Sequence, residues 1–383
     1  MRAIRKYLGG DKVIWAVVFI LSLYSVLAVY STSGILAFRN PGISSTYYIM
    51  KHALFLFAGL VLIYVIHLVP YRYFSRLSQI LLIIAIPLLV ITLFFGEDIN
   101  RASRWLEIPV IGLTFQTSDF AKVALVMYVA RVLSQEQENI HDFYRAFLPI
   151  IFPVGIVCVL IMPDNLSTAL ILFVTCVILM FTGRIRTRYL VVLFFAGIFL
   201  ISSYVGIVIL TEKEGRVGTW KSRIESYFDK DNENYQVEQA KIAIATGGLF
   251  GKFPGNSTQR NFIPHSYSDF IYAVIIEEYG LLLGGIPIIL MYLILLYRAG
   301  VMLRKSSRAF PAFLAVGLTL GLVLQAMVHM AVSVSLFPVT GQPLPLISMG
   351  GTSMMFTCIS LGMILSVSRG LKEQEENVEP AQG

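Results

Sequence analysis

Charged residues are scarce in this chain of 383 residues. Only 14% of its positions carry Asp, Glu, Lys or Arg, whereas soluble domains carry roughly 25%. Hydrophobic residues reach 56%, and this combination excludes an ordinary soluble domain. Lys and Arg outnumber Asp and Glu by 30 to 23, but they are scattered through loops and form no patch interleaved with aromatics. We therefore predict no nucleic-acid partner, and in a membrane protein such an excess sets orientation instead.

Cysteine is also scarce. The chain has three, Cys158, Cys176 and Cys358, all in apolar segments and without a CxxC pair. We interpret them as small buried hydrophobes, which excludes a disulfide framework and a thiolate metal site. The Gly-rich segment 247–270 lacks the spacing of a phosphate-binding P-loop. No dinucleotide fingerprint, Ser-His-Asp arrangement, metal motif or cleavable signal peptide is evident.

Long apolar runs are abundant. A helix needs about 20 apolar residues to cross a bilayer, and ten stretches qualify or nearly qualify. They are 13–30, 52–69, 77–95, 119–133, 147–162, 166–182, 189–210, 270–297, 311–336 and 344–367. We predict an all-α polytopic membrane protein with ten transmembrane helices and a large extracellular loop, 211–268, between helices 7 and 8.

The Lys and Arg clusters predict the orientation. They occur before the first run, after the second, sixth and eighth, and after the tenth. Because short basic loops stay in the cytoplasm, we expect a cytoplasmic N-terminus (1–12), helices 1–7 (13–210), an extracytoplasmic loop (211–268), helices 8–10 (269–368) and a disordered cytoplasmic tail (369–383).

Three carboxylates lie at or inside the mouth of the eighth run. The segment reads PHSYSDFIYAVIIEEYG and contains Asp269, Glu277 and Glu278. A carboxylate in hydrocarbon costs at least about 2.5 kcal/mol on insertion scales and marks function or a specific partner. Asp269 has two interpretations, a helix cap or a reactive group at the outer surface. We expect Glu277 and Glu278 to anchor the helix by pairing with Lys or Arg inside the bundle.

A second polar cluster enters the fourth run. Asp119 and Lys122 are three residues apart, so they share a helix face and can pair. They form either an ion pair that holds two helices together or, with Arg101 and Arg104, a basic lining for an anionic lipid head group. Asp164 has two interpretations as well: a cap for the sixth run, or a cap that also faces an outer cavity.

Two further features have open roles. Gln325 and His329 are four residues apart in the ninth run, and His329 is either a helix–helix hydrogen-bonding group or a proton relay. The Gly- and Pro-rich segment 339–353 is either a wall of the outer site or a plain turn.

These motifs together resemble the SEDS family, the RodA, FtsW and SpoVE type of bacterial cell-wall polymerase. The most specific segments are RASRWLEI…FQTSDFAK, MPDNLSTAL, GGLFGK…GNSTQRNFIPHSYSDFIYAVIIEEYG and FPVTGQPLPLISMGGTS. They occur in the right order over nearly the whole chain. The opening segment, GDKVIW…SVLAVYST, resembles the FtsW branch, which acts in division, more than the RodA branch.

The resemblance implies a function and a set of residues. The family polymerises lipid II, and the 4-hydroxyl of one sugar attacks the anomeric carbon of another while undecaprenyl pyrophosphate leaves. Its essential aspartate corresponds to Asp269, which would act as general base. Residues expected to bind substrate are Arg101, Arg104, Lys122, Asp119, Asp164, Gln259, Ser348 and Gly350. The chain departs from the family at Asp119, Met349 and His329, where the family has Glu, Tyr and commonly Asn.

The resemblance also implies surroundings and partners. We expect the bacterial cytoplasmic (inner) membrane, lipid II as substrate, a class B penicillin-binding protein that acts as transpeptidase, other division proteins, and membrane lipid. No cofactor is assigned, and a divalent cation (Mg²⁺ or Mn²⁺) is left open. The alternatives are a lipid II flippase or transporter, which needs no reactive carboxylate, and a non-catalytic division scaffold.

Overall fold

The computed structural model describes residues 9–39, 42–95, 97–99, 102–108, 113–210 and 235–378. The chain divides into two compact units. The first unit consists of Met1–Tyr71, Glu233–Ser306 and Leu318–Gly383, and the second unit consists of Arg72–Asn232 and Ser307–Gly317. Each unit is described by itself below.

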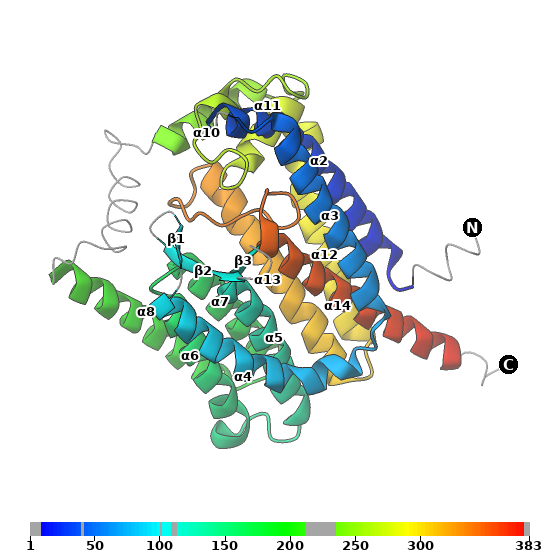
Figure 1. Ribbon diagram of the computed structural model, residues 1–383. Coiled ribbons are helices and arrows are strands. Elements are labelled where there is room, and N and C mark those ends of the chain that lie inside the picture. Colours follow the sequence, from blue (N-terminus) through cyan, green and yellow to red (C-terminus); the bar gives the residue numbers. More distant parts are fainter. Residues whose placement is uncertain are drawn as a thin grey trace. The chain divides into compact units, whose positions relative to one another are not determined.

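The first unit is helical. Its elements are α2 (Lys12–Arg39), α3 (Ser45–Leu68), α10 (Tyr235–Gly247), a 3-10 turn (Gln259–Asn261), α11 (Ile271–Gly280), a π-helical turn (Leu281–Gly285), α12 (Ile286–Lys305), the later part of α13 (Ala309–Ser333) and α14 (Gly351–Val378). Helices α3 and α14 pack against each other, as do α10 and α11 (Figure 1). A Cβ atom at Gly59 would lie 2.6 Å from Sγ of Cys358, so glycine permits the close approach of α3 to α14.

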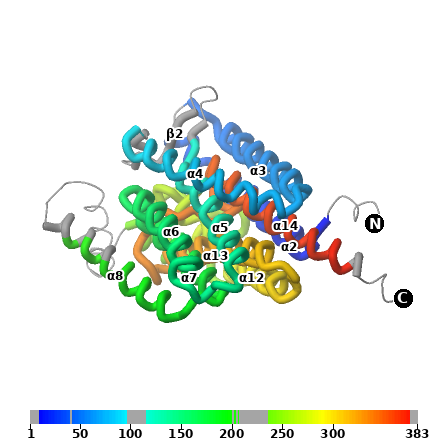
Figure 2. The backbone as a smooth tube through the Cα atoms, turned by 90° about the horizontal axis from the view of Figure 1, so that it is seen from below, coloured from blue at the N-terminus to red at the C-terminus, as the bar shows by residue number. Residues whose placement is uncertain are grey.

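The second unit surrounds α5. It contains α4 (Arg72–Phe95), α5 (Thr117–Gln135), a π-helical turn (Phe143–Phe147), α6 (Leu148–Ile161), α7 (Leu166–Thr182), α8 (Thr187–Leu210) and the start of α13. Helix α5 packs on α4, α6 and α7 (Figure 2). Most of its side chains are buried, among them Leu125, Val129 and Leu133, each fully inaccessible. Helix α5 is therefore the core of this unit.

A small sheet occupies part of a segment predicted to be a loop. Strands β1 (Glu97–Ile99), β2 (Ala102–Ile108) and β3 (Leu113–Gln116) form an antiparallel sheet in the order β1-β2-β3, with Trp105 opposite Gln116 and Ile108 opposite Leu113. The predicted all-α architecture omitted this sheet. The residues involved include Trp, Ile, Thr and Phe, which favour strands, but the run is too short for its periodicity to stand out.

The apolar helices confirm a polytopic membrane protein. In the described part of the chain, seven helical stretches are long and apolar enough to cross a membrane, and α7 and the first part of α8 are shorter apolar helices. Each predicted run overlaps a helix. Helix α5 falls outside both groups, since its 19 residues include three charged ones, Asp119, Lys122 and Arg131. The count of ten membrane spans stays a prediction.

The eighth run is not one continuous helix. Helix α11 ends at Gly280, whose φ of 74° is left-handed, and a π-helical turn leads into α12. The break frees the N–H groups of Leu281 and Leu282, which donate to the carbonyls of Gly248 and Leu249 at 3.0 and 3.1 Å. A Cβ at Gly280 would lie 2.3 Å from the oxygen of Leu249, so the position requires glycine.

The predicted end of the chain differs as well. Residues 344–350 form turns, and α14 begins at Gly351 and continues to Val378. The expectation of a disordered tail at 369–383 is therefore wrong as far as Val378, and 379–383 lie outside the described residues. Ion pairs stabilise this helical end: Arg369 with Glu373 four residues on, at 3.3 Å, and Lys305 with Glu375 at 3.0 Å.

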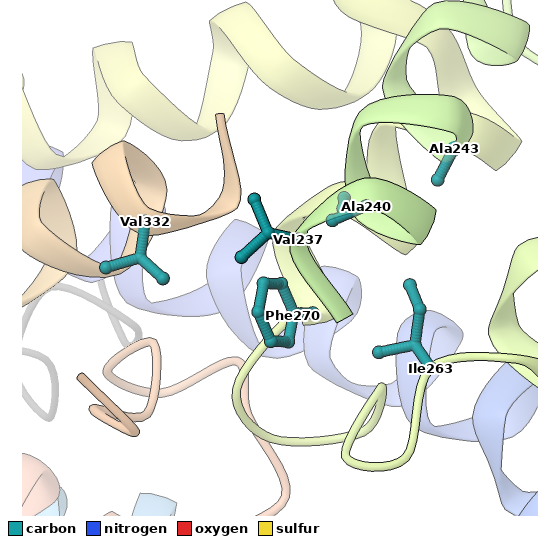
Figure 3. Packing of buried hydrophobic residues seen from close by; sticks show 7 residues of the cluster. Val237, Ala240, Ala243, Ile263, Phe270 and Val332 are labelled. Atoms are coloured by element: carbon teal, nitrogen blue, oxygen red, sulfur yellow. The ribbon is translucent and has the colours of Figure 1, made fainter. Parts of the chain in front are cut away.

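The described part of the predicted loop, 235–268, contains a helix and packs around a small hydrophobic cluster. Helix α10 lies in it, and its buried residues Val237, Ala240 and Ala243 pack with Ile263, Phe270, Ala273 and Val332 (Figure 3). Residues 211–234 lie outside the described residues. This cluster attaches the loop to the start of α11 and to the end of α13.

Candidate functional site

Asp269 lies in a turn directly before α11. Its backbone N–H donates to the carbonyl of His265 at 2.9 Å. The residue that caps α11 is Phe270, and no side chain makes a capping hydrogen bond there. The capping interpretation of Asp269 is therefore wrong. The fully buried ring of Phe270, next to Val237 in Figure 3, fixes the backbone on one side of the carboxylate.

The carboxylate of Asp269 is half-buried and has no hydrogen bond or ion pair with the described part of the chain. The loop backbone approaches it closely, since a Cβ built on Gly341 would lie 3.5 Å from Oδ2. Burial, and then the negative charge of Asp269, raise the pKa of the Tyr267 hydroxyl above its ordinary value. The hydroxyl of Tyr267 therefore stays protonated.

Two residues near Asp269 were missed from the sequence. The positive charge of Arg39 acts on Tyr267, and its guanidinium donates to the carbonyl of Pro264 at 2.5 Å. Tyr267 lies only two residues before Asp269, and this closeness in sequence could have predicted that it lies near the carboxylate. Arg39 comes from the end of α2, far away in the chain, and nothing in its local sequence points to the turn.

Ser348 binds the Asp269 turn. Its hydroxyl donates to the carbonyl of Ser268 at 2.8 Å and accepts from the N–H of Leu344 at 2.8 Å. The next residue, Met349, donates its N–H to the carbonyl of Tyr267 at 3.1 Å. Ser348, a predicted substrate ligand, is buried, and its hydroxyl forms hydrogen bonds with protein backbone. Gly350 is half-buried immediately before α14, and its carbonyl accepts the N–H of Met354.

Gln325 and His329 also bind the segment before α14. Nδ1 of His329 lies 2.7 Å from the carbonyl of Gln342, and the amide of Gln325 donates to the carbonyl of Pro343 at 2.9 Å. Both bonds go to loop backbone, so His329 is a hydrogen-bonding group, as one of its two interpretations required, but it joins a helix to a loop and not to another helix. The segment 339–350 lies against the Asp269 turn, as its interpretation as a wall of the site requires.

The pairing predicted for Glu277 and Glu278 is confirmed, but the basic partners come from the loop segment 252–260 and not from inside the helix bundle. Lys252 lies 2.7 Å from Glu277, and Arg260 lies 3.7 Å from Glu278. Glu277 also accepts from Ser257, Thr258 and the backbone N–H of Gln259. Gln259, a predicted substrate ligand, thus belongs to this anchor through its backbone, and its side-chain oxygen is buried with no hydrogen-bond partner in the part of the chain that the structure describes. The anchor holds segment 252–260 on α11.

In the second unit, Asp119 and Lys122 pair at 2.7 Å. Both belong to α5, so the pair lies within one helix and does not join two helices, as one interpretation required. The Asp119 side chain is only 3% exposed, and its second oxygen, Oδ2, is buried without a hydrogen-bond partner among the described residues. Arg104 belongs to β2, where its side chain is not described, and Arg101 lies outside the described residues.

Asp164 is not the cap of α7. The cap is Asn165, whose side-chain oxygen accepts the N–H of Thr168 at 3.2 Å. Asp164 is half-buried in the turn that precedes it, with its N–H donating to Ile161. The interpretation of Asp164 as the cap is therefore wrong. Over the described ranges, no group of three or more His, Cys, Asp or Glu could hold a metal ion.

Comparison with known proteins places this architecture. The family described as FtsW/RodA/SpoVE cell cycle proteins matches residues 11–373. The chain is 31% identical over 366 residues to a protein of Trichlorobacter lovleyi named "Probable peptidoglycan glycosyltransferase FtsW", covering 94% of both chains. It is 30% identical over 368 residues to "Stage V sporulation protein E" of Bacillus subtilis, covering 95% of this chain and 98% of the relative.

Solved structures agree in fold. A chain from a structure described as "Structural coordination of polymerization and crosslinking by a peptidoglycan synthase complex" matches with a TM-score of 0.73 at 23% identity, over 95% of this chain and 99% of that one. The rod shape determining protein RodA of Thermus thermophilus matches with a TM-score of 0.68 at 22% identity, over 95% and 98%. Helical spans and relatives together indicate a multi-pass protein of the bacterial inner membrane. The chain belongs to the FtsW/RodA/SpoVE family, which is the SEDS family that its motifs indicated.

Proposed function

We propose that this protein is a peptidoglycan glycosyltransferase that polymerises lipid II, with Asp269 as general base. The observation that carries the proposal is the half-buried carboxylate of Asp269, which has no bonding partner in the described part of the chain and does not cap its helix. The hydrogen bonds of the surrounding turn fix its backbone. Relatives named peptidoglycan glycosyltransferases support the reaction, and the FtsW names support a role in division.

The proposed step follows from acid–base chemistry. Asp269 accepts the proton of the acceptor 4-hydroxyl while that oxygen forms a bond to the anomeric carbon of the donor sugar. The bond from this carbon to the pyrophosphate oxygen breaks, and undecaprenyl pyrophosphate takes the bonding electrons. A positioned general base contributes about 10²–10⁴-fold to such a rate.

The leaving group needs cations. Its negative charge increases in the transition state, so fixed positive charge stabilises that state more than the ground state. By the family resemblance we assign this role to Arg101, Arg104 and Lys122 of the second unit. Asp119 would orient Lys122 through their ion pair, and Asp164 would contact the polar part of the lipid.

The proposed topology has ten spans, cytoplasmic termini and an outward-facing segment 211–268. Cysteines introduced at Asn256 and Ser307, both exposed, should then react differently with an impermeant thiol reagent in intact cells. Only the first should be labelled, and equal labelling would contradict the topology.

We also propose a class B penicillin-binding protein as partner. A structure of similar fold described as a peptidoglycan synthase complex supports this, and affinity capture from detergent extracts that repeatedly lacks a transpeptidase would count against it.

One experiment separates the candidate functions. The purified protein is incubated with labelled lipid II, with and without Mg²⁺ or Mn²⁺. Glycan chains indicate a polymerase. Transfer of lipid II across vesicle membranes without chain formation indicates a flippase. The absence of both chain formation and transfer indicates a scaffold.

Asp269→Asn then tests the assigned base. The amide keeps the size of the side chain but cannot accept the proton, so chain formation should fall at least about a hundredfold with little change in melting temperature. Asp269→Glu should be partly active at best, because the extra methylene displaces the carboxylate. Normal chain formation by Asp269→Asn would end the assignment.

A further inference from the structure

Four backbone carbonyls in segment 342–348 are each bound by a side chain from a helix. The carbonyls belong to Gln342, Pro343, Pro345 and Ile347, and their partners are, in the same order, His329, Gln325, Tyr292 and Ser25. We call these four side chains the carbonyl clamp. They come from α2 and from the consecutive helices α12 and α13, so three helices hold one short segment.

The clamp is deeply buried. Ser25, Tyr292 and His329 are at most 1% exposed, and Gln325 is 7% exposed. A buried carbonyl without a partner is costly, and two prolines in this segment prevent regular secondary structure from supplying partners. The helices therefore supply them. The same segment could not keep this path if the four donors were removed.

A fifth side chain supports the clamp from α3. Nε2 of His52 lies 2.9 Å from the hydroxyl oxygen of Ser25. Because the hydroxyl proton of Ser25 goes to the carbonyl of Ile347, at 2.9 Å, the histidine must donate to Ser25. His52 thus orients Ser25 toward the segment.

The clamped segment is bonded in turn to the Asp269 turn. Ser348 donates to Ser268 and Met349 donates to Tyr267. Gly341, at the other end of the segment, lies against the carboxylate of Asp269 itself. The position of Asp269 is therefore linked through two hydrogen-bonded steps to side chains inside the helices.

We propose that the carbonyl clamp, Ser25, Tyr292, Gln325 and His329, positions Asp269 for proton abstraction, an inference that rests on the proposed function. In the described part of the chain none of the four bonds to the carboxylate of Asp269, and each binds a backbone carbonyl instead, so they are positioning residues. Displacement of a catalytic group by about 1 Å can lower a rate on the order of a hundredfold. Loss of one clamp bond should therefore change turnover more than substrate binding.

Tyr292→Phe is the sharpest test, because it removes only one hydroxyl. The matched control is Tyr272→Phe. Tyr272 is also buried, at 3% exposure, and its hydroxyl also donates to a backbone carbonyl, that of Gly285, which lies in the π-helical turn and not in the clamped segment. We expect Tyr292→Phe to lower kcat for glycan-chain formation about tenfold with a nearly unchanged KM, and Tyr272→Phe to change kcat less than twofold.

A double-mutant cycle separates positioning from general destabilisation. In an Asp269→Asn background the carboxylate is already lost, so Tyr292→Phe should lower the residual turnover no further. Hydrogen exchange of peptides from 339–350 and 265–270 gives a readout without activity, and it should accelerate in Tyr292→Phe but not in Tyr272→Phe. At His329, Asn retains an N–H donor, so His329→Asn should keep more activity than His329→Leu.

The outcomes are distinct. If the parent protein makes no glycan chains, the proposed function fails, while accelerated exchange would still show the clamp. If the parent is active but Tyr292→Phe leaves kcat unchanged, or lowers it equally in both backgrounds, the positioning inference is overturned. Equal losses in Tyr292→Phe and Tyr272→Phe would overturn it as well.

Discussion

The hydroxyl of Ser348 lies 2.8 Å from the backbone carbonyl of Ser268, the residue immediately before Asp269. The two serines are 80 residues apart in sequence, and the same hydroxyl also accepts the N–H of Leu344. This single side chain therefore fixes both the clamped segment and the turn that carries the candidate base.

Ser348→Ala should lower both stability and turnover. The change leaves the N–H of Leu344 and the carbonyl of Ser268 without their partner, and an unsatisfied buried group costs about 1–3 kcal/mol. We expect a lower melting temperature and a reduced kcat. If Ser348 contacted substrate instead, KM would rise and stability would hold. Ser360→Ala is the control, because the Ser360 hydroxyl only donates back to the carbonyl of Phe356 within α14.

Lys252→Gln should destabilise the protein more than Glu277→Gln. Removing one partner of a buried ion pair costs about 3–5 kcal/mol when the charge that remains is buried and unpaired. After Lys252→Gln that charge is the fully buried carboxylate of Glu277, and the hydrogen bonds from Ser257 and Thr258 offset only part of the cost. After Glu277→Gln the remaining charge is the ammonium of Lys252, whose side chain is 30% exposed and can be hydrated. Denaturant unfolding of both variants measures the difference, and a larger loss in Glu277→Gln would contradict the assignment of this ion pair.

Gly280→Ala should be strongly destabilising, whereas Gly300→Ala should not. Gly280 has a φ of 74°, and a Cβ there would meet the oxygen of Leu249 at 2.3 Å. Such strain costs on the order of 1–3 kcal/mol before the clash is added. Gly300 lies in α12, with nothing within 4 Å of a Cβ, so alanine should stabilise it by about 0.4–1 kcal/mol. Thermal unfolding in detergent tests both, and equal melting temperatures would refute the described break.

Asp119→Asn and Lys122→Met test the role of the ion pair in α5. If the pair is only structural, each single change should lower the melting temperature by a similar amount, and the double change should restore stability and activity. If Lys122 binds the pyrophosphate, Lys122→Met should abolish most glycan-chain formation in a folded protein. The double variant would then regain stability but stay inactive. Rescue of both properties would favour the structural role.

The sequence by itself determined the membrane class, the helical runs and the main acidic residues. The length of an apolar run that spans the membrane is set by the thickness of the bilayer, so such a run can be recognised without knowing which other segments it packs against. Glu277 and Glu278 could also be assigned to ion pairs from the sequence, because a carboxylate within an apolar run requires a cationic partner.

Only the tertiary structure decided which groups meet. The break at Gly280, the helical end of α14 and the partners of Ser348 and His329 depend on segments far apart in the chain. The sheet β1-β2-β3 depends on which neighbouring strands pair and in which register. The cap interpretations of Asp269 and Asp164 were wrong by one residue each, because the caps are the next residues, Phe270 and Asn165. The sequence pattern near a helix start does not distinguish the cap from the residue before it. Hydrogen bonds join specific atoms over about 3 Å, and no local pattern specifies which carbonyl a buried tyrosine or histidine will reach.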